Sequence, residues 1–199
     1  MHTFFVDIGG VLLTNGWDRV ARREAAHFFQ YDLREFEERH KEIYYAYELG
    51  QIRLEEYLHY VLFHQERSFT LHQFTEFLFA RSKAIPDMIS AMQELREKMH
   101  CRIFALSNEG REIACHRVEK FHLAQWIDGF IFSSFVGRRK PDPAIYRLAL
   151  DIAQVTPSQV IYLEDRAPFV EEARSLGLTA IHHKDVATTM KSIKEIAFP

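Results

Sequence analysis

Five short apolar segments constrain the fold of this 199-residue chain most strongly. They are residues 3–7 (TFFVD), 101–107 (CRIFALS), 129–134 (GFIFSS), 160–165 (VIYLED) and 179–183 (TAIHH). Their apolar residues mostly run on without alternating polar ones, which is typical of strands buried on both faces, as in a parallel sheet. Helical patterns lie between the last four segments, and one of them opens with Asp142 as N-cap and Pro143 in its first turn. We therefore predict an α/β fold with right-handed crossovers.

The segment 15–85 has a different character. It contains no strand pattern, and four helical patterns fill it, at residues 19–30, 33–49, 53–65 and 71–82. Gly50 stands where a C-terminal helix cap is expected. Because this segment interrupts the chain after its first strand, we predict an inserted helical-bundle cap at 15–85. The α/β core domain that carries the active site is then formed by residues 1–14 and 86–199.

Composition excludes several classes of protein. Hydrophobic residues make up 47% of the chain and charged residues 27%, which is typical of a folded protein. The net charge of -3 gives no basic field for nucleic acid or anionic membranes. No basic leader precedes the first apolar run, and no run approaches the roughly 20 residues of a membrane span. The two cysteines, Cys101 and Cys115, give no disulfide framework. We expect a soluble, cytoplasmic protein, either monomer or homodimer, that binds neither nucleic acid nor membranes.

Polar residues follow four of the predicted strands. They are Asp7 after the first strand, Ser107 and Asn108 after the second, Lys140 (in GRRKPDP) after the third, and Glu164 and Asp165 at the end of the fourth. In open parallel sheets, ligands bind at the carboxyl ends of the strands, so these side chains are expected to converge.

The chemistry of this set indicates a metal and a phosphate. Converging carboxylates repel one another unless a cation lies among them, and oxygen ligands of this kind suit Mg²⁺. A lysine and a hydroxyl beside a metal can bind a phosphoryl group through charge and hydrogen bonds. Gly9 and Gly10 would let the backbone approach that group and offer its N–H groups. A carboxylate in this position can attack phosphorus as a nucleophile.

This order of residues resembles the haloacid dehalogenase (HAD)-like hydrolase superfamily, whose members are mostly Mg²⁺-dependent phosphatases with a Rossmann-like core. The matching motifs are DIGGVL, SN, the lysine of GRRKPDP, and ED in YLEDRAPFVEEARSLG. The helical insert is similar to the small cap of one branch. The D-x-G form of the first motif is similar to that of sugar-1-phosphate phosphatases.

The resemblance implies a role for each residue. Asp7 would be the nucleophile that forms an aspartyl-phosphate on a small phosphorylated metabolite, and Lys140 would bridge phosphate and Asp7. Mg²⁺ would be held by Asp7, the carbonyl of Gly9, and Asp165, with Glu164 as a supporting acid. The phosphate group would be bound by Gly9, Gly10, Ser107, Asn108 and Lys140.

Gly9 departs from the pattern of this superfamily. Most of its phosphatases carry a second Asp there, which protonates the leaving oxygen and later activates water. Three interpretations stay open. The enzyme could favour substrates whose leaving group needs little protonation, such as sugar 1-phosphates. Another acid could take over the role, with Asp18, Glu48 and Glu109 as candidates. The site could also be a catalytically dead module that binds metal and phosphate.

One further alternative concerns the whole site. A metal-free haloacid dehalogenase would use the same Asp7, but it would leave the Glu164–Asp165 pair without a cation. The eleven histidines lack the spacing of a zinc site, so surface or packing roles are expected.

If the cap closes over the site, the residues expected to touch the substrate are Trp17, Tyr44, Tyr47 and Glu48.

Overall fold

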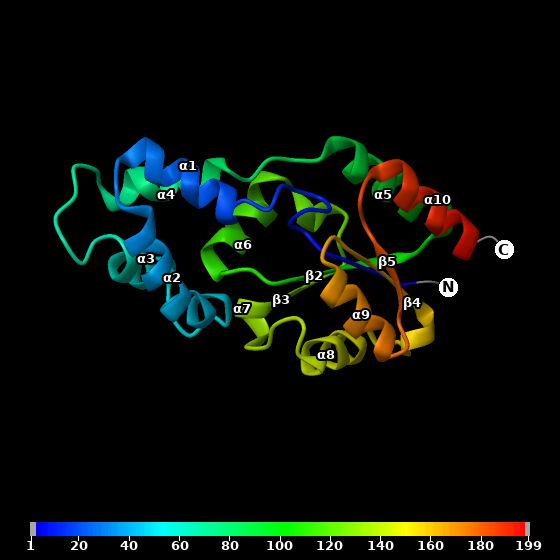
Figure 1. Cartoon of the computed structure of the whole chain (residues 1–199). Coiled ribbons are helices and arrows are strands. Elements are labelled where there is room, and N and C mark those ends of the chain that lie inside the picture. The colour runs from blue at the N-terminus through cyan, green and yellow to red at the C-terminus, as the bar shows by residue number, and fades with distance from the viewer. Residues whose placement is uncertain (1–2, 198–199) are drawn as a thin grey trace.

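A five-stranded parallel sheet forms the centre of the protein in a computed structural model that describes residues 3–197 (Figure 1). Its strands are β1 (Thr3–Val6), β2 (Arg102–Ser107), β3 (Gly129–Phe132), β4 (Val160–Glu164) and β5 (Thr179–His182). The strand order is β3-β2-β1-β4-β5, and every neighbouring pair is parallel. The predicted α/β fold is confirmed. Since β1 pairs with β2 on one side and β4 on the other, Asp7 leaves the sheet at its middle.

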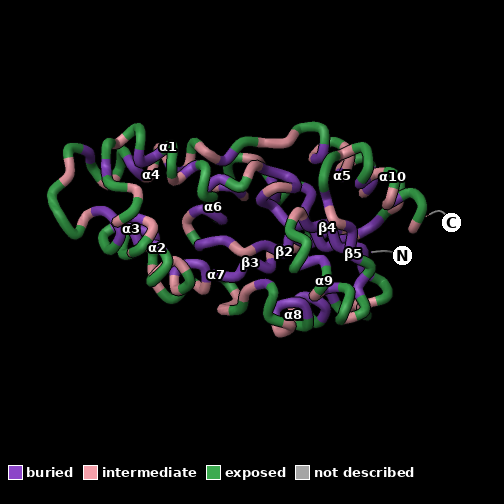
Figure 2. The backbone as a smooth tube through the Cα atoms, in the orientation of Figure 1, coloured by how far each residue is buried: buried purple, intermediate pink, exposed green. Residues whose placement is uncertain are grey.

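Helices cover both faces of the sheet. The helices α5 (Pro86–Met99), α6 (Arg111–Lys120) and α10 (Val186–Ala197) share one hydrophobic core with Phe4 and Val6 of β1. The helices α8 (Pro143–Ala153) and α9 (Ala167–Ser175) share the opposite core with Phe5. Successive side chains of a strand point to opposite faces, so a strand between two cores needs apolar residues at every position. Figure 2 shows the resulting concentration of buried residues along the strands.

The remaining long helices lie at one end of the molecule, away from β5 and α10 (Figure 1). They are α1 (Arg19–Phe29), α2 (Leu33–Glu48), α3 (Leu54–Val61) and α4 (Leu71–Ala80), and they surround a core of their own that is rich in aromatic residues. Asp18, Asp32 and Thr70 accept hydrogen bonds at the N-termini of α1, α2 and α4. The chain reverses after α2 at Gly50, whose φ of +70° favours glycine. The division into a cap at 15–85 and a core stays a prediction.

Two elements end earlier than the sequence pattern indicates. The helix α3 stops at Val61, and beyond it the Leu62 carbonyl accepts a hydrogen bond from Arg67 Nε at 2.7 Å. The strand β3 stops at Phe132, where the chain enters the short helix α7 (Ser133–Val136). Between residues 3 and 197, no helix has both the length and the apolar character needed to cross a membrane.

Candidate active site

The carboxyl edge of the sheet brings most of the predicted residues together around one cavity of 410 Å³, whose lining does not include Gly10 and Glu164. Asp7 is 5% exposed, and its backbone is fixed because its N–H donates to the Leu163 carbonyl at 3.0 Å. The side chain is held as well, since Asp7 Oδ1 accepts from the N–H of Ile8 at 2.8 Å. The cavity is also lined by Gly9, Ser107, Asn108, Lys140 and Asp165.

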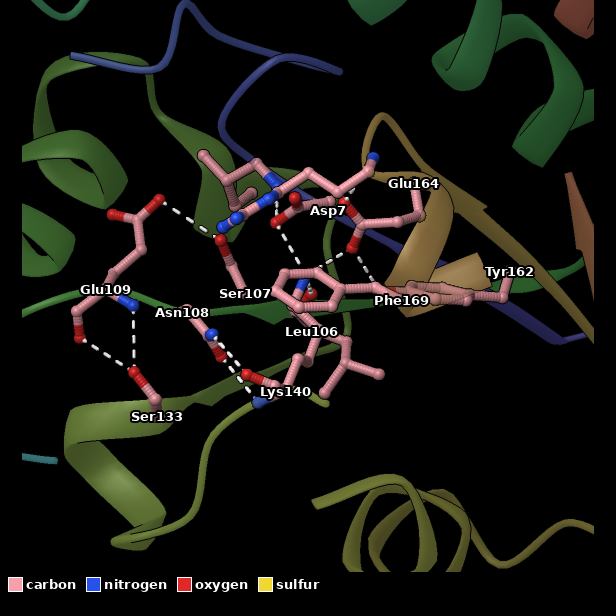
Figure 3. A network of polar contacts seen from close by, with 12 residues as sticks. Asp7, Leu106, Ser107, Asn108, Glu109, Ser133, Lys140, Tyr162, Glu164 and Phe169 are labelled. Carbon is pink, nitrogen blue, oxygen red and sulfur yellow. Dashed lines mark hydrogen bonds and ion pairs between the residues drawn. The ribbon is translucent and has the colours of Figure 1, made fainter. Parts of the chain in front are cut away.

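Lys140 is fully buried and lies between two carboxylates (Figure 3). Its Nζ is 3.1 Å from Asp7 Oδ1 and 2.6 Å from Glu164 Oε2, and it donates to the Leu106 carbonyl at 3.0 Å. Burial alone would lower the pKa of Lys140, but Asp7 and Glu164 together raise it above its usual range. The lysine is therefore a cation held beside Asp7.

Asn108 fixes the loop that carries this lysine. The Lys140 N–H donates to Asn108 Oδ1 at 2.8 Å, and Asn108 Nδ2 donates to the Lys140 carbonyl at 2.9 Å. The Asn108 amide is thus engaged with backbone, so its observed contacts position Lys140. Its predicted role as a phosphate ligand stays a prediction.

The pKa of Asp7 is raised to about 6 by burial and by the nearby Glu164. Lys140 and the Ser107 hydroxyl act in the opposite direction and lower it. Asp7 is a buried carboxylate beside one cation and a second carboxylate, so its negative charge is not fully neutralised. A further positive charge would stabilise its ionised form.

Asp7, Glu164 and Asp165 each offer an oxygen within 4.8 Å of the others. Glu164 is already saturated, because it accepts from Lys140 and from the Tyr162 hydroxyl, and its Oε1 accepts from the Arg166 N–H at 3.0 Å. Asp165 differs, since its buried Oδ1 has no hydrogen-bond partner among residues 3–197. An unpartnered buried oxygen beside two further acids fits a divalent cation. The observed contacts of Glu164 hold Lys140, and its predicted role as a supporting metal ligand stays a prediction.

Gly10 makes room for this cluster. A Cβ on Gly10 would lie 2.1 Å from Asp165 Oδ2, and the residue has a φ of +78° that favours glycine. Gly9 is crowded by other groups. A Cβ there would lie 3.1 Å from Asn15 Oδ1 and 3.7 Å from Arg117 Nη1. The place where a side chain of residue 9 would begin is therefore bordered by an amide and a guanidinium.

Arg117 on α6 is a residue that the sequence analysis missed. It is 2% exposed, and its guanidinium donates to Glu109 Oε1 at 2.5 Å and to Ser82 Oγ at 3.0 Å. It also donates to the carbonyls of Thr14 and Asn15, at 3.2 and 2.8 Å. It thus ties both ends of the 15–85 segment to α6. A lone arginine in a helix usually indicates a solvated face, so no sequence signal distinguished it.

Three of the four residues expected to touch the substrate do line the cavity, namely Trp17, Tyr44 and Glu48. Tyr47 does not; it is fully buried, and its ring stacks on that of Tyr57 with centroids 5.3 Å apart. Arg139 lies with its Nη2 2.8 Å from Glu48 Oε2. The sequence analysis also missed five other residues of the cavity wall, which are Asn15, Arg19, Arg22, Arg166 and Phe169. Across residues 3–197, the group of potential metal ligands consists of acids alone, without histidine.

This fold and this arrangement of acids, hydroxyl and lysine define a hydrolase of the haloacid dehalogenase type. A family model described as haloacid dehalogenase-like hydrolase matches residues 1–177. The chain belongs to that family.

Curated relatives match parts of the chain. Rat bifunctional epoxide hydrolase 2 is 28% identical over 128 residues, which are 62% of this chain and 23% of the relative. The phosphorylated carbohydrates phosphatase of Thermotoga maritima is 33% identical over 100 residues, which are 50% of this chain and 46% of the relative. The chain therefore spans less than half the length of these relatives.

Solved structures share the fold over nearly the whole chain. A HAD family enzyme from Bacteroides thetaiotaomicron superposes with a TM-score of 0.80 at 20% identity, covering 92% of this chain and 94% of the other. Its complex with magnesium and inorganic phosphate gives a TM-score of 0.79 at 19% identity, covering 95% and 98%. A dehalogenase gives a TM-score of 0.64 at 20% identity, covering 90% and 83%. At these identities the likeness establishes the fold.

Proposed function

We propose that this protein is a Mg²⁺-dependent phosphatase that hydrolyses a small phosphorylated metabolite through an aspartyl-phosphate on Asp7. The observation that carries this proposal is the buried cluster at the sheet edge. One lysine contacts Asp7 and Glu164, while Asp165 adds a third carboxylate within 4.8 Å of both acids. Two buried carboxylates and a third beside them need more positive charge than Lys140 supplies.

Each residue then has a chemical role. Asp7, the Gly9 carbonyl and Asp165 would hold Mg²⁺, and Glu164 would support them through Lys140. Bound Mg²⁺ would supply positive charge to the oxygens of the phosphoryl group. Phosphoryl transfer proceeds through a loose transition state, so catalysis depends on positioning and on charge stabilisation. Lys140 would bind a phosphoryl oxygen and keep Asp7 in line with phosphorus, with the Ser107 hydroxyl and the N–H groups near Gly10 as further donors.

Relatives favour phosphate chemistry over dehalogenation. A Thermotoga maritima relative is a phosphorylated carbohydrates phosphatase, and the Bacteroides enzyme of the same fold binds magnesium with inorganic phosphate. A metal-free dehalogenase would leave the buried Oδ1 of Asp165 without a partner. A cavity of 410 Å³ that is lined by Arg22, Tyr44 and Glu48 suits a small polar metabolite. If Gly9 leaves the acid role unfilled, sugar 1-phosphates and other good leaving groups are the expected substrates.

Phosphate release from two matched sets of substrates tests this function. One set has good leaving groups: p-nitrophenyl phosphate, acetyl phosphate and hexose 1-phosphates. The other has poor ones: hexose 6-phosphates and glycerol phosphate. We expect turnover that requires Mg²⁺ and is abolished by Asp7→Asn. If neither set is turned over while Mg²⁺ still binds, the protein is a binding module and the proposal is wrong.

A further inference from the structure

The leaving oxygen of a phosphate ester needs a proton, and the site lacks an obvious donor. An alkoxide is a poor leaving group, and a positioned acid typically contributes about 10²–10⁴-fold by protonating it. Gly9 carries no side chain. This inference rests on the proposed phosphatase function and asks which residue of the cavity wall supplies the proton. The carboxyl, amino and phenol groups of that wall belong to Asp7, Asp18, Tyr44, Glu48, Glu109, Lys140 and Asp165.

The cap side of the wall offers no suitable donor. Asp18 is exposed and occupied, because its Oδ1 accepts from the Ala21 N–H at 2.9 Å as the N-cap of α1. Burial raises the pKa of the Glu48 carboxyl, but three cations, Arg139, Arg166 and Lys140, oppose this, and Glu48 Oε2 lies 2.8 Å from Arg139 Nη2. Tyr44 holds its proton too tightly, since burial raises the pKa of its phenol above the usual range. On the core side, Asp7, Asp165 and Lys140 already have roles in the proposed chemistry, which leaves Glu109.

Glu109 is a buried carboxylate held in one orientation. It is 5% exposed and lies between β2 and α6, where its backbone N–H donates to Ser133 Oγ at 2.9 Å. Its Oε1 accepts from Arg117 at 2.5 Å and from the Ser107 hydroxyl at 3.3 Å. Its Oε2 is buried and has no hydrogen-bond partner within residues 3–197. One oxygen is thus fixed by protein and the other is free to exchange a proton.

The position of Glu109 relates it to the reacting atoms. Ser107 lies between Glu109 and Asp7 in the view of Figure 3, and its hydroxyl both donates to Glu109 and lowers the pKa of Asp7. On the other side, the Arg117 Nη1 that bonds Glu109 lies 3.7 Å from where a Cβ of Gly9 would be. A single Arg117 nitrogen, Nη1, therefore contacts the Glu109 carboxylate and lies close to the position that a Cβ of residue 9 would occupy.

The charges that face Glu109 suit an acid that gains and loses a proton. Burial raises the pKa of the Glu109 carboxyl above its usual range, and Arg117 on α6 opposes this. Asp7 at the end of β1 raises it further. Glu48 of α2 also faces this carboxylate and is influenced by its charge, as is the Tyr44 phenol.

We propose that Glu109 is the catalytic acid and base of this protein, in place of the side chain missing at residue 9. In the first step Asp7 bonds to phosphorus, the bond from phosphorus to the leaving oxygen breaks, and the proton on Glu109 Oε2 moves to that oxygen. In the second step a water oxygen bonds to phosphorus, the bond to Asp7 breaks, and the water proton returns to Glu109. Arg117 positions the carboxylate throughout.

The variant Glu109→Gln tests this role, because glutamine keeps the shape and the acceptor for Arg117 but cannot exchange the proton. We expect the wild-type protein to turn over both substrate sets. We expect the variant to lose about 10²–10⁴-fold in kcat on glycerol phosphate and hexose 6-phosphates. With p-nitrophenyl phosphate, whose leaving group needs no proton, the variant should release one nitrophenolate per site in a burst and then stall as the aspartyl-phosphate.

The matched control is Glu119→Gln, an exposed glutamate near the end of α6, which should behave as wild type. If Glu109→Gln does not fold because Arg117 has lost its counter-charge, the double variant Glu109→Gln/Arg117→Gln replaces it in the same burst measurement. Unchanged turnover of the poor leaving groups, or an equal loss on both sets without a burst, would overturn the assignment of Glu109. A wild-type protein that releases no phosphate at all would instead overturn the proposed function.

Discussion

At the scale of single residues, Lys140 supplies the positive charge that faces two buried carboxylates of the site. Its ammonium group contacts one oxygen of Asp7 and one of Glu164, and both carboxylates are nearly or fully buried. A buried charge that loses its partner is strongly destabilising, whereas a satisfied pair is close to neutral. The same contact that prepares Asp7 for chemistry is therefore a condition for folding at neutral pH.

We expect Lys140→Met to lower the free energy of unfolding by about 3–5 kcal/mol at pH 8 without divalent metal, because two buried carboxylates lose their cation. The loss should shrink towards pH 5. Folded Asp7, whose pKa is about 6, holds its proton more tightly than the unfolded chain, where the value is 3.8. Stability therefore falls as pH rises through this window and is least affected below it.

Urea unfolding at the two pH values measures this effect. The surface variant Lys184→Met is the control, and Lys140→Met/Glu164→Gln should recover part of the loss. An equal destabilisation at pH 5 and pH 8 would show that packing of the lysine stem, not its charge, matters.

The residues at the strand ends could be predicted from the sequence, because a parallel sheet brings the ends of β1, β2 and β4 to one edge whatever the loops do. Asp7, Glu164 and Asp165 lie together for that reason. The burial of Arg117 could not be predicted. Its depth depends on how α6 packs against residues far away in the chain, such as Thr14 and Ser82.

At the scale of secondary structure, α2 carries a buried histidine that makes the packing of α2 against α3 sensitive to acid. His40 is 7% exposed, and its Nδ1 lies 2.8 Å from the hydroxyl of Tyr57 on α3. Burial, helped by the nearby Arg22, lowers the pKa of His40 from 6.5 to about 4. The folded protein thus keeps this imidazole neutral at a pH where the unfolded chain would protonate it.

Because the unfolded chain binds the extra proton, this contribution to stability is present above pH 6.5 and is lost as pH falls towards 4. We expect His40 alone to cost about 2 kcal/mol of unfolding free energy between pH 7 and pH 5. In His40→Gln that part of the pH dependence should disappear, while the exposed His59→Gln should retain it. Thermal unfolding of the three proteins at both pH values would show this, and parallel curves for wild type and His40→Gln would contradict it.

The helix starts were easier to predict than the ends. Asp142 caps α8 as expected, since its Oδ1 accepts from the Ala144 N–H at 2.8 Å. The end of α3 has no Gly or Pro signal, and Leu62 continues the apolar pattern past Val61. Beyond Val61 the Arg67 side chain, five residues after Leu62, donates to the Leu62 carbonyl. The apolar pattern does not reveal this side-chain contact.

At the scale of the whole molecule, three hydrophobic cores surround one polar cavity. Two cores lie on the faces of the sheet and the third lies among α1–α4, and the cavity is lined from both parts. At this cavity Asp7, Glu164 and Asp165 offer oxygens within 4.8 Å of one another beside a single lysine, so cation binding and global stability are expected to be linked.

We expect Mg²⁺ to raise the unfolding free energy by about 2.7 kcal/mol at one hundred times its dissociation constant, and EDTA to reverse the gain. Asp165→Asn should remove most of this response, because it neutralises the carboxylate whose Oδ1 lacks a partner. The exposed Asp151→Asn on α8 is the matched control. Differential scanning calorimetry over a Mg²⁺ series gives the comparison. A wild-type response that Asp165→Asn retains in full would place the cation elsewhere.

The central claim is that Asp7 becomes phosphorylated, and acid-quenched trapping tests it most directly. The protein is mixed with Mg²⁺ and p-nitrophenyl phosphate, quenched in acid within the first turnover, digested and examined by peptide mass spectrometry. We expect a phosphoryl group on the peptide that contains Asp7, absent without Mg²⁺ and absent in Asp7→Asn. Phosphate release from the wild-type protein without any modification of Asp7 would contradict the account.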